Sequence, residues 1–368
     1  MKKLLVATGG GDCPGLNAVI RGITKAAESV GEWEVYGSIQ AFKSFPTGEL
    51  EVIPLTSRNT AGIHVKGGTI LKTSNQDDPL NYPAPDGSGE TVNRCGELAS
   101  VIKKDYDAVI NIGGDGSQRI SQELHKNGVK VVGVPKTIDN DLSATDLTFG
   151  FSTAVQIATD SFDKLVTTAE SHHRVLIMEV MGRDAGWIAL HTAIAGGAEI
   201  CLIGEIPWKV ENIVAKIQDR IHEGRGFVNI VIAEGAIESE QRKVTFHSDV
   251  LGDQTVKLDA GVILRMRLEE ALEKERRGNV RPPEVRTTTL GHVQRGGTPI
   301  AFDRILATAM GVKAFEMVQA GDFGSMVAYH NQDVVSVPLA KAVETMKFVT
   351  KDHYLVKVAR STGISFGD

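Results

Sequence analysis

The sequence predicts an α/β protein with mainly parallel sheets, organised as two α/β units. Three observations lead to this prediction. Short apolar runs end in glycines, helical patterns follow these runs, and the same alternation returns in the second half of the chain. The length of 368 residues exceeds the usual size of one domain, about 100–200 residues, which also favours two domains.

The first unit begins with a strand, a glycine loop and a helix. Residues 4–8 read Leu-Leu-Val-Ala-Thr, glycines occupy 9–11, and apolar residues recur at helical spacing over 16–23. Two further strands, each leading into a polar or glycine-rich segment, are expected at residues 108–112 and 129–134. Strands separated by helical segments in this way predict a parallel sheet.

The second unit opens with one apolar stripe from Ser152 to Ala169, which predicts a long crossover helix. Alternating strands and helices follow, at residues 175–180, 185–195, 200–203, 210–223 and 228–233. The last expected elements are a helix at 264–277, a strand at 287–290 and a helix at 305–318. Because no Pro/Gly/Ser-rich linker separates the halves, we expect the two domains to exchange segments.

The charge balance disfavours a dedicated nucleic-acid-binding protein. Lys and Arg number 40 and Asp and Glu 46, giving a net charge of −6. A polyanionic substrate would have to meet locally clustered cations. The three cysteines, Cys13, Cys95 and Cys201, fit neither a disulfide framework nor a paired-thiol metal site. With no signal-like or membrane-spanning run, we expect a cytoplasmic protein that binds no membrane.

The first glycine cluster predicts a phosphate site. Gly9, Gly10, Gly11 and Gly15 lie between a strand and a helix, as in dinucleotide-binding loops. A nicotinamide site would require an acidic residue at the end of the second strand, yet residues 38–41 are Ser-Ile-Gln-Ala. Bare backbone N–H groups at a helix N-terminus remain a general phosphate site. The alternative is a plain turn that needs small residues.

The second glycine cluster places one carboxylate among residues that let a ligand approach the backbone. Asp115 lies within Gly113-Gly114-Asp115-Gly116-Ser117, which suits Mg²⁺ held beside phosphates. An aspartate that merely caps a helix is equally open. The sequence contains no Walker A motif.

Two carboxylates, Asp139 and Asp141, follow the third predicted strand. In an extended loop they would point to different partners, one taking a proton from a hydroxyl and the other orienting a cation. Lys136 lies beside them. The alternative is an Asx-rich surface turn.

Arginines lie at either end of several other predicted strands or in glycine-rich segments. A single one would be read as a surface residue, but the set predicts phosphate clamps. Its members are Arg174, Arg183, Arg286 and Arg295. His292, beside Arg295, could bind a sugar hydroxyl.

Together these motifs resemble those of the 6-phosphofructokinase family over nearly the full length of the chain. The matching segments are 10–18, 113–117, 135–141, 171–174, 179–183, 195–197, Glu234 and 290–297, followed by Asp303 and Arg304.

The resemblance implies two similar three-layer αβα (Rossmann-like) domains with the reaction between them. Residues 1–150 plus 299–347 would bind ATP and Mg²⁺, and residues 151–298 plus 348–368 would bind fructose 6-phosphate. The implied reaction is phosphoryl transfer to the sugar 1-hydroxyl.

The resemblance also implies roles for individual residues. Asp139 would be the base, with Thr137 and Asp141 beside it, and Arg183 and Lys136 would assist the transfer. Donor and metal contacts would come from Gly11, Gly114, Asp115 (the Mg²⁺ residue), Gly116, Ser117 and Lys72. The sugar phosphate would contact Thr137, Asp139, Met181, Gly182, Arg183, Glu234, His292 and Arg295. Arg174 and Arg286 would reach its 6-phosphate across a subunit interface, which implies a homodimer or homotetramer.

The chain departs from the family pattern at several places. Asn75 stands where many members carry an arginine, and Lys136 replaces a glycine of ordinary bacterial ATP enzymes. Either Lys136 or Lys72 could supply the missing cation. The insertion near residues 238–259 has no counterpart in the short bacterial enzymes.

Two residues bear on the identity of the phosphoryl donor, and they favour different donors. Gly116 leaves space for the α-phosphate and nucleoside of ATP, whereas typical pyrophosphate users of the family carry an aspartate there. Lys136 is typical of pyrophosphate users. We expect ATP, with pyrophosphate as the alternative donor. A less favoured alternative is a catalytically silent nucleotide-binding regulatory protein.

Overall fold

The chain folds into two compact units, each built from two stretches of sequence. The structure is a computed structural model that describes all residues except 75–77, 85–86, 240–258 and 277–280. The first unit comprises Met1–Thr153 and Arg295–Lys347, and the second Ala154–Gln294 and Phe348–Asp368. The chain therefore enters each unit twice.

The first unit is built on an eight-stranded sheet in the order β14-β13-β7-β6-β1-β2-β3, with β8 paired to β7. The strands on both sides of β1 and β7 run parallel, whereas the outer strands β3 and β14 are antiparallel to their neighbours. The strands are β1 (Lys2–Thr8), β2 (Trp33–Ser38), β3 (Val52–Leu55), β6 (Ala108–Gly113), β7 (Val131–Thr137), β8 (Phe149–Gly150), β13 (Ser325–His330) and β14 (Asp333–Pro338). A separate short hairpin consists of β4 (Tyr82–Pro83) and β5 (Thr91–Val92).

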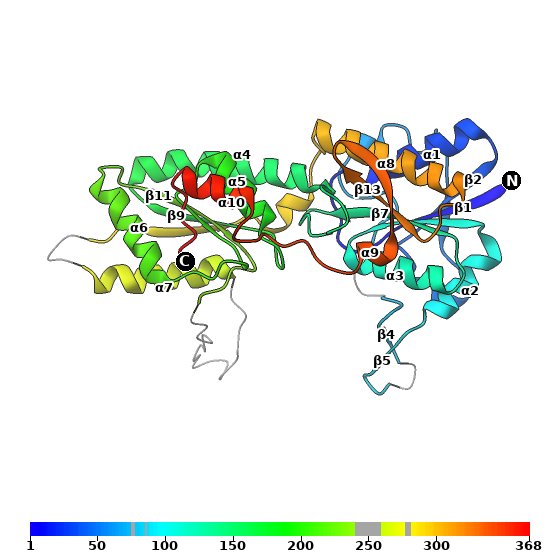
Figure 1. Cartoon of the computed structure of the whole chain (residues 1–368), viewed down its shortest axis with the longest axis horizontal. Coiled ribbons are helices and arrows are strands. Elements are labelled where there is room, and N and C mark those ends of the chain that lie inside the picture. The colour runs from blue at the N-terminus through cyan, green and yellow to red at the C-terminus, as the bar shows by residue number, and fades with distance from the viewer. Residues whose placement is uncertain (75–77, 85–86, 240–258, 277–280) are drawn as a thin grey trace. The chain divides into compact units, whose positions relative to one another are not determined.

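Helices cover both faces of this sheet (Figure 1). On one face lie α1 (Leu16–Val30) and α8 (Ala301–Ala320), and on the other α2 (Cys95–Asp105), α3 (Asp115–Lys126) and α9 (Leu339–Ala342). Short 3₁₀ turns are η1 (Phe45–Thr47) and η2 (Ile63–Val65). The close approach of α1 and α8 requires glycine, because a Cβ at Gly311 would lie 2.5 Å from the Val19 carbonyl oxygen.

The second unit contains four parallel strands in the order β10-β11-β9-β12. These are β9 (Val175–Val180), β10 (Ile200–Leu202), β11 (Val228–Ala233) and β12 (Val285–Thr289). The sheet lies between two layers of helices (Figure 1): α4 (Phe151–His172), α5 (Trp187–Gly196) and α10 (Tyr354–Ser361), and opposite them α6 (Val210–His222) and α7 (Ala260–Lys274). The turn η3 spans Gly291–Arg295. The predicted α/β class with mainly parallel sheets is confirmed.

One boundary differs from the sequence prediction at a functionally important place. The third predicted strand, 129–134, is observed as Val131–Thr137, and all seven of its residues are buried. Lys136 and Thr137, expected in the polar segment after the strand, therefore belong to it. A strand covered by helices on both faces is normally apolar throughout. The charge of Lys136 therefore led the sequence prediction to end the strand at residue 134.

The three cysteines are buried free thiols. Among the described residues, no helix combines the length and the apolar character that crossing a membrane requires.

Candidate active site

A cavity of about 190 Å³ lies in the first unit where β1, β6 and β7 end. Ligands of doubly wound α/β sheets bind at the carboxyl ends of the strands, which is where this cavity lies. Its walls are Gly10, Gly11, Gly114, Asp115, Gly116, Ser117, Lys136, Thr137, Asp139, Asp141 and Arg295. The predicted phosphate loops and the carboxylate segment thus meet in one place.

The two glycine loops pack so closely that side chains are excluded. A Cβ at Gly113 would lie 2.2 Å from the Ser117 side chain, and one at Gly9 would lie 2.7 Å from the Ser117 Oγ. A Cβ at Gly11 would lie 2.6 Å from an Arg295 guanidinium nitrogen. α3 begins at Asp115, immediately after these loops, so its N-terminal amides face this end of the sheet. That geometry favours an anion.

Two cations line the cavity. The Lys136 ammonium donates a hydrogen bond to the Gly11 carbonyl, and Arg295 Nη1 donates to the Asp12 carbonyl at 3.3 Å. Burial lowers the pKa of Lys136, and the neighbouring Arg295 lowers it further, whereas nearby Asp139 and Asp12 act to raise it. An incoming polyphosphate would add negative charge here and so favour the protonated lysine.

Both carboxylates of the predicted pair line this same cavity, and their assignment to different partners stays a prediction. The loop is not extended, because Asn140 between them has a left-handed φ of 51°. The Asp139 amide donates to the Thr137 hydroxyl at 3.1 Å. Burial raises the pKa of Asp141, whose Oδ1 has no hydrogen-bond partner within the described chain.

A second cavity of about 180 Å³ adjoins the first and shares Gly10, Gly116 and Ser117 with it. Its other walls are Gly9, Gln40, Ala41, Phe42, Ser74, Asp78, Pro79, Asn111 and Ile120. Gly116 lies on both cavities, and a Cβ placed on it would have no heavy atom within 4 Å among the described residues. The space beyond the phosphate loops is therefore open, as the sequence predicted for Gly116.

Four of the predicted sugar-phosphate residues cluster in the second unit, after β9 and β11. Gly182, with a φ of 128°, donates its amide to Glu234 Oε1 at 3.3 Å. The Met181 amide donates to Gln294 Oε1 at 2.8 Å, a contact that sequence reasoning missed because nothing marks Gln294 apart from its place beside Arg295. The Arg183 side chain is 77% exposed and pairs with Asp184 at 3.0 Å.

Arg174 and Arg286 lie close together because both contact Glu284. Arg174 Nε pairs with Glu284 at 2.5 Å, and Arg286 pairs with the other oxygen of the same carboxylate. These arginines hold the pKa of Glu284 below its usual value. Sequence reasoning missed Glu284, although its position two residues before Arg286 could have indicated it.

Other predicted residues lie elsewhere. Lys72 is exposed and is not among the described residues that line either cavity. His292 is exposed in η3, whereas Arg295, at the end of that turn, belongs to the first unit and not to the predicted second domain. Asn75 and almost all of the insertion 238–259 fall outside the described residues.

The family follows from comparison with known proteins. A family model described as phosphofructokinase matches residues 3–318. The chain belongs to the phosphofructokinase family. This membership confirms the resemblance found in the sequence.

Two curated relatives of this phosphofructokinase chain carry different donor names. The chain is 42% identical over 371 residues to the "ATP-dependent 6-phosphofructokinase 2" of Clostridium perfringens, covering all of this chain and 99% of that protein. It is also 42% identical over 351 residues to the "Pyrophosphate--fructose 6-phosphate 1-phosphotransferase" of Amycolatopsis methanolica, a match that covers 95% of this chain and 96% of that protein.

The fold is shared with a solved phosphofructokinase from Saccharomyces cerevisiae, at a TM-score of 0.74 and 26% identity. The match covers 98% of this chain and 47% of the yeast chain, so this chain spans about half of the yeast protein's length.

Proposed function

We propose that the chain transfers the terminal phosphoryl group of ATP to the 1-hydroxyl of fructose 6-phosphate, a kinase reaction of glycolysis that yields fructose 1,6-bisphosphate. The observation that carries the proposal is the first cavity, where glycine loops, two cations and three aspartates converge. Phosphoryl transfer depends mainly on positioning and on neutralising charge, and this set supplies both. The name of the Clostridium perfringens relative supports ATP as the donor.

Within this cavity each group has a distinct task. Asp139 accepts the proton of the sugar hydroxyl, and Thr137 and Asp141 flank it. Lys136 and Arg295 neutralise the charge on the transferring group. Outside this cavity, Arg183 of the second unit is assigned to the substrate as a contact. The amides of Gly11 and of residues 114–117, at the N-terminus of α3, hold the donor phosphates.

The residues present fit a magnesium ion bound mainly through the donor. Arg119 pairs with Oδ2 of Asp115 at 2.8 Å, so the second carboxylate oxygen can take a cation. No group of three or more His, Cys, Asp or Glu side chains in the described chain could enclose a metal. Mg²⁺ is commonly held by one or two carboxylates together with substrate phosphates. When bound, it would neutralise phosphate charge beside Asp115.

The acceptor is assigned to the second unit, and donor binding to the first. Met181, Gly182, Arg183 and Glu234 gather after β9 and β11, and His292 lies in the turn after β12. Carboxylate and imidazole groups recognise sugar hydroxyls through hydrogen bonds.

We place the protein in the cytoplasm, where its three free thiols stay reduced.

Arg174 and Arg286 are proposed to bind the 6-phosphate of a partner subunit's substrate, which requires a homodimer or homotetramer. The contact that both arginines make with Glu284 supports this proposal. Two guanidinium groups that hold one carboxylate between them are spaced to hold a phosphate.

Mixing two inactive variants, Asp139→Ser and Arg286→Ala, is expected to restore activity. Each hybrid interface would contain one intact and one doubly altered site, so a random mixture of dimers should reach roughly a quarter of wild-type turnover. The measurement is turnover after joint refolding, with each variant refolded alone as the control. Hybrids that form, as shown by differently tagged subunits, but stay inactive would contradict shared sites.

Pyrophosphate is the second candidate donor, favoured by one observation. Lys136 lies beside the glycine loop, where its ammonium contacts the Gly11 carbonyl and would meet a donor phosphate directly. The name of the Amycolatopsis methanolica relative agrees with that donor. The open space at Gly116 favours ATP, because pyrophosphate leaves the second cavity unfilled.

The product identifies the acceptor atom. With ATP, Mg²⁺ and fructose 6-phosphate, phosphorus NMR should show a second sugar phosphate on C1 and an equal amount of ADP. ADP formation without a new sugar phosphate would indicate hydrolysis and would contradict the proposal.

A further inference from the structure

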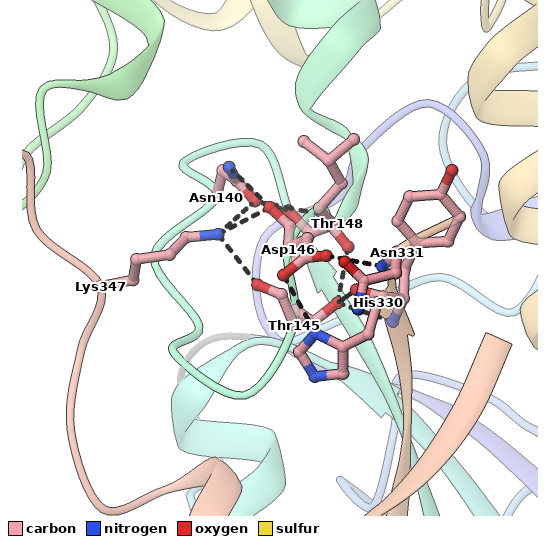
Figure 2. A network of polar contacts seen from close by, with 9 residues as sticks. Asn140, Thr145, Asp146, Thr148, His330, Asn331 and Lys347 are labelled. Carbon is pink, nitrogen blue, oxygen red and sulfur yellow. Dashed lines mark hydrogen bonds and ion pairs between the residues drawn. The ribbon is translucent and has the colours of Figure 1, made fainter. Parts of the chain in front are cut away.

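The loop that carries Asp139 and Asp141 is held by a lysine more than 200 residues away in sequence. Lys347 is the last residue of the first unit. Its ammonium donates hydrogen bonds to Asn140 Oδ1 at 3.1 Å and to the carbonyls of Thr145 and Asp146 at 3.0 and 2.9 Å (Figure 2). An ammonium has three N–H donors, and these three oxygens match them.

The backbone at Lys347 holds the same loop. Its amide donates to the Asp141 carbonyl at 2.7 Å, and Met346 pairs with Leu142 in an antiparallel bridge. The segment that ends at Lys347 therefore contacts the loop before, at and after Asp141. Its backbone meets Asp141 and Leu142, and the ammonium meets Asn140 and, farther along the loop, Thr145 and Asp146.

Asn140 is the link between the ammonium and the carboxylates. It lies between Asp139 and Asp141, is 4% exposed and has a left-handed backbone, a conformation that costs most residues free energy. Its Oδ1 also accepts the Thr148 amide at 3.2 Å. Lys347 thereby stabilises the turn that brings both aspartates to one cavity.

The far end of the loop is anchored separately, to the turn between β13 and β14. Asp146 accepts the Asn331 amide at 3.0 Å and lies 3.0 Å from His330 Nδ1, as Figure 2 shows. Because Asp146 keeps these two side-chain contacts when the ammonium is lost, removal of the ammonium should loosen the turn at Asn140 while leaving this end of the loop attached.

We propose that Lys347 is a positioning residue for phosphoryl transfer, whose ammonium holds the turn at Asn140 so that Asp139 meets the acceptor hydroxyl in the required orientation. The inference rests on the proposed role of Asp139. Lys347 itself does not line the described cavity, so it acts through the loop. Burial lowers the pKa of Lys347 to about 8, because removing the ammonium from water disfavours its charged form. The three oxygens around the ammonium compensate for part of this lost hydration.

The test is Lys347→Met, which keeps an unbranched side chain but removes the ammonium. We expect kcat to fall about 10- to 100-fold, the scale on which a displaced reacting group lowers turnover, with KM for both substrates within about threefold. Lys341→Met, at an exposed position on α9 in the same segment, is the matched control and should leave kcat unchanged.

A double substitution separates positioning from general structural support. In the Asp139→Ser background the loop no longer carries the base, so adding Lys347→Met should lower residual kcat less than about threefold. An equal loss in both backgrounds would show that Lys347 only supports the fold and would overturn the inference.

A second variant covers the case in which Lys347→Met fails to fold. Asn140→Gly keeps the left-handed backbone accessible but removes the acceptor, and we expect a comparable fall in kcat. If Asp139→Ser abolishes turnover while Asn140→Gly, or a folded Lys347→Met, stays within threefold of wild type, this inference fails and the proposed function stands. If Asp139→Ser retains turnover, the proposed role of Asp139 fails, and the inference with it.

Discussion

Replacement of Asp139 by serine is expected to lower kcat by at least about 10²-fold while KM for fructose 6-phosphate changes little. The carboxylate lies in the cavity with Thr137 and Lys136, where it can take the hydroxyl proton as the phosphoryl group arrives. Serine is smaller and cannot act as a base at neutral pH. Initial rates with saturating ATP and Mg²⁺ measure the effect.

Asp105→Ser is the matched control for this substitution. Asp105 is exposed at the end of α2 and lines neither described cavity, so its replacement should leave kcat unchanged. If the Asp139 variant kept more than about a tenth of wild-type turnover, the assignment of the base would be wrong.

Gly116→Asp is expected to reduce kcat/KM for ATP by roughly 100-fold or more while changing that for pyrophosphate less than about tenfold. Gly116 lines both cavities, so a carboxylate there would oppose the phosphates of a bound nucleotide and narrow the route to the second cavity. Juxtaposed like charges cost several kcal/mol, which is enough for an effect of this size. Folding should be unaffected, because the space beside Gly116 is open.

Gly116→Asn separates bulk from charge, since it adds nearly the same volume without the negative charge. We expect it to retain more ATP activity than Gly116→Asp. An equal loss with ATP and pyrophosphate in the aspartate variant would show that Gly116 does not distinguish the donors and that the second cavity does not receive a nucleoside.

Local sequence patterns predicted the parts of the structure that depend on local chemistry. The strand over residues 108–112 follows from an apolar run that ends in glycines and is observed as Ala108–Gly113, followed at once by Gly114 and by Asp115 as the first residue of α3. The chemical types that line the first cavity, glycine amides, a lysine and aspartates, were likewise expected, although their roles remain predictions.

Long-range packing determined what local patterns could not show. Lys136 lies within β7. Because a strand covered by helices on both faces is normally apolar throughout, the charge of Lys136 made the strand look shorter in the sequence than it is. Arg295, the first residue of the first unit's second stretch of sequence, contacts the carbonyl of Asp12 beside the first glycine loop, and Glu284 pairs with two arginines. Lys347 gave no signal, because its partners are mainly backbone carbonyls of a loop about 200 positions earlier.

The most direct test of the proposed function is kcat/KM of the wild-type protein for ATP and for pyrophosphate, each with Mg²⁺ and saturating fructose 6-phosphate. We predict turnover with both Mg²⁺ and ATP present and a kcat/KM at least about tenfold higher for ATP than for pyrophosphate, a difference of about 1.4 kcal/mol in transition-state stabilisation. A preference for pyrophosphate, or no turnover with either donor, would contradict the account.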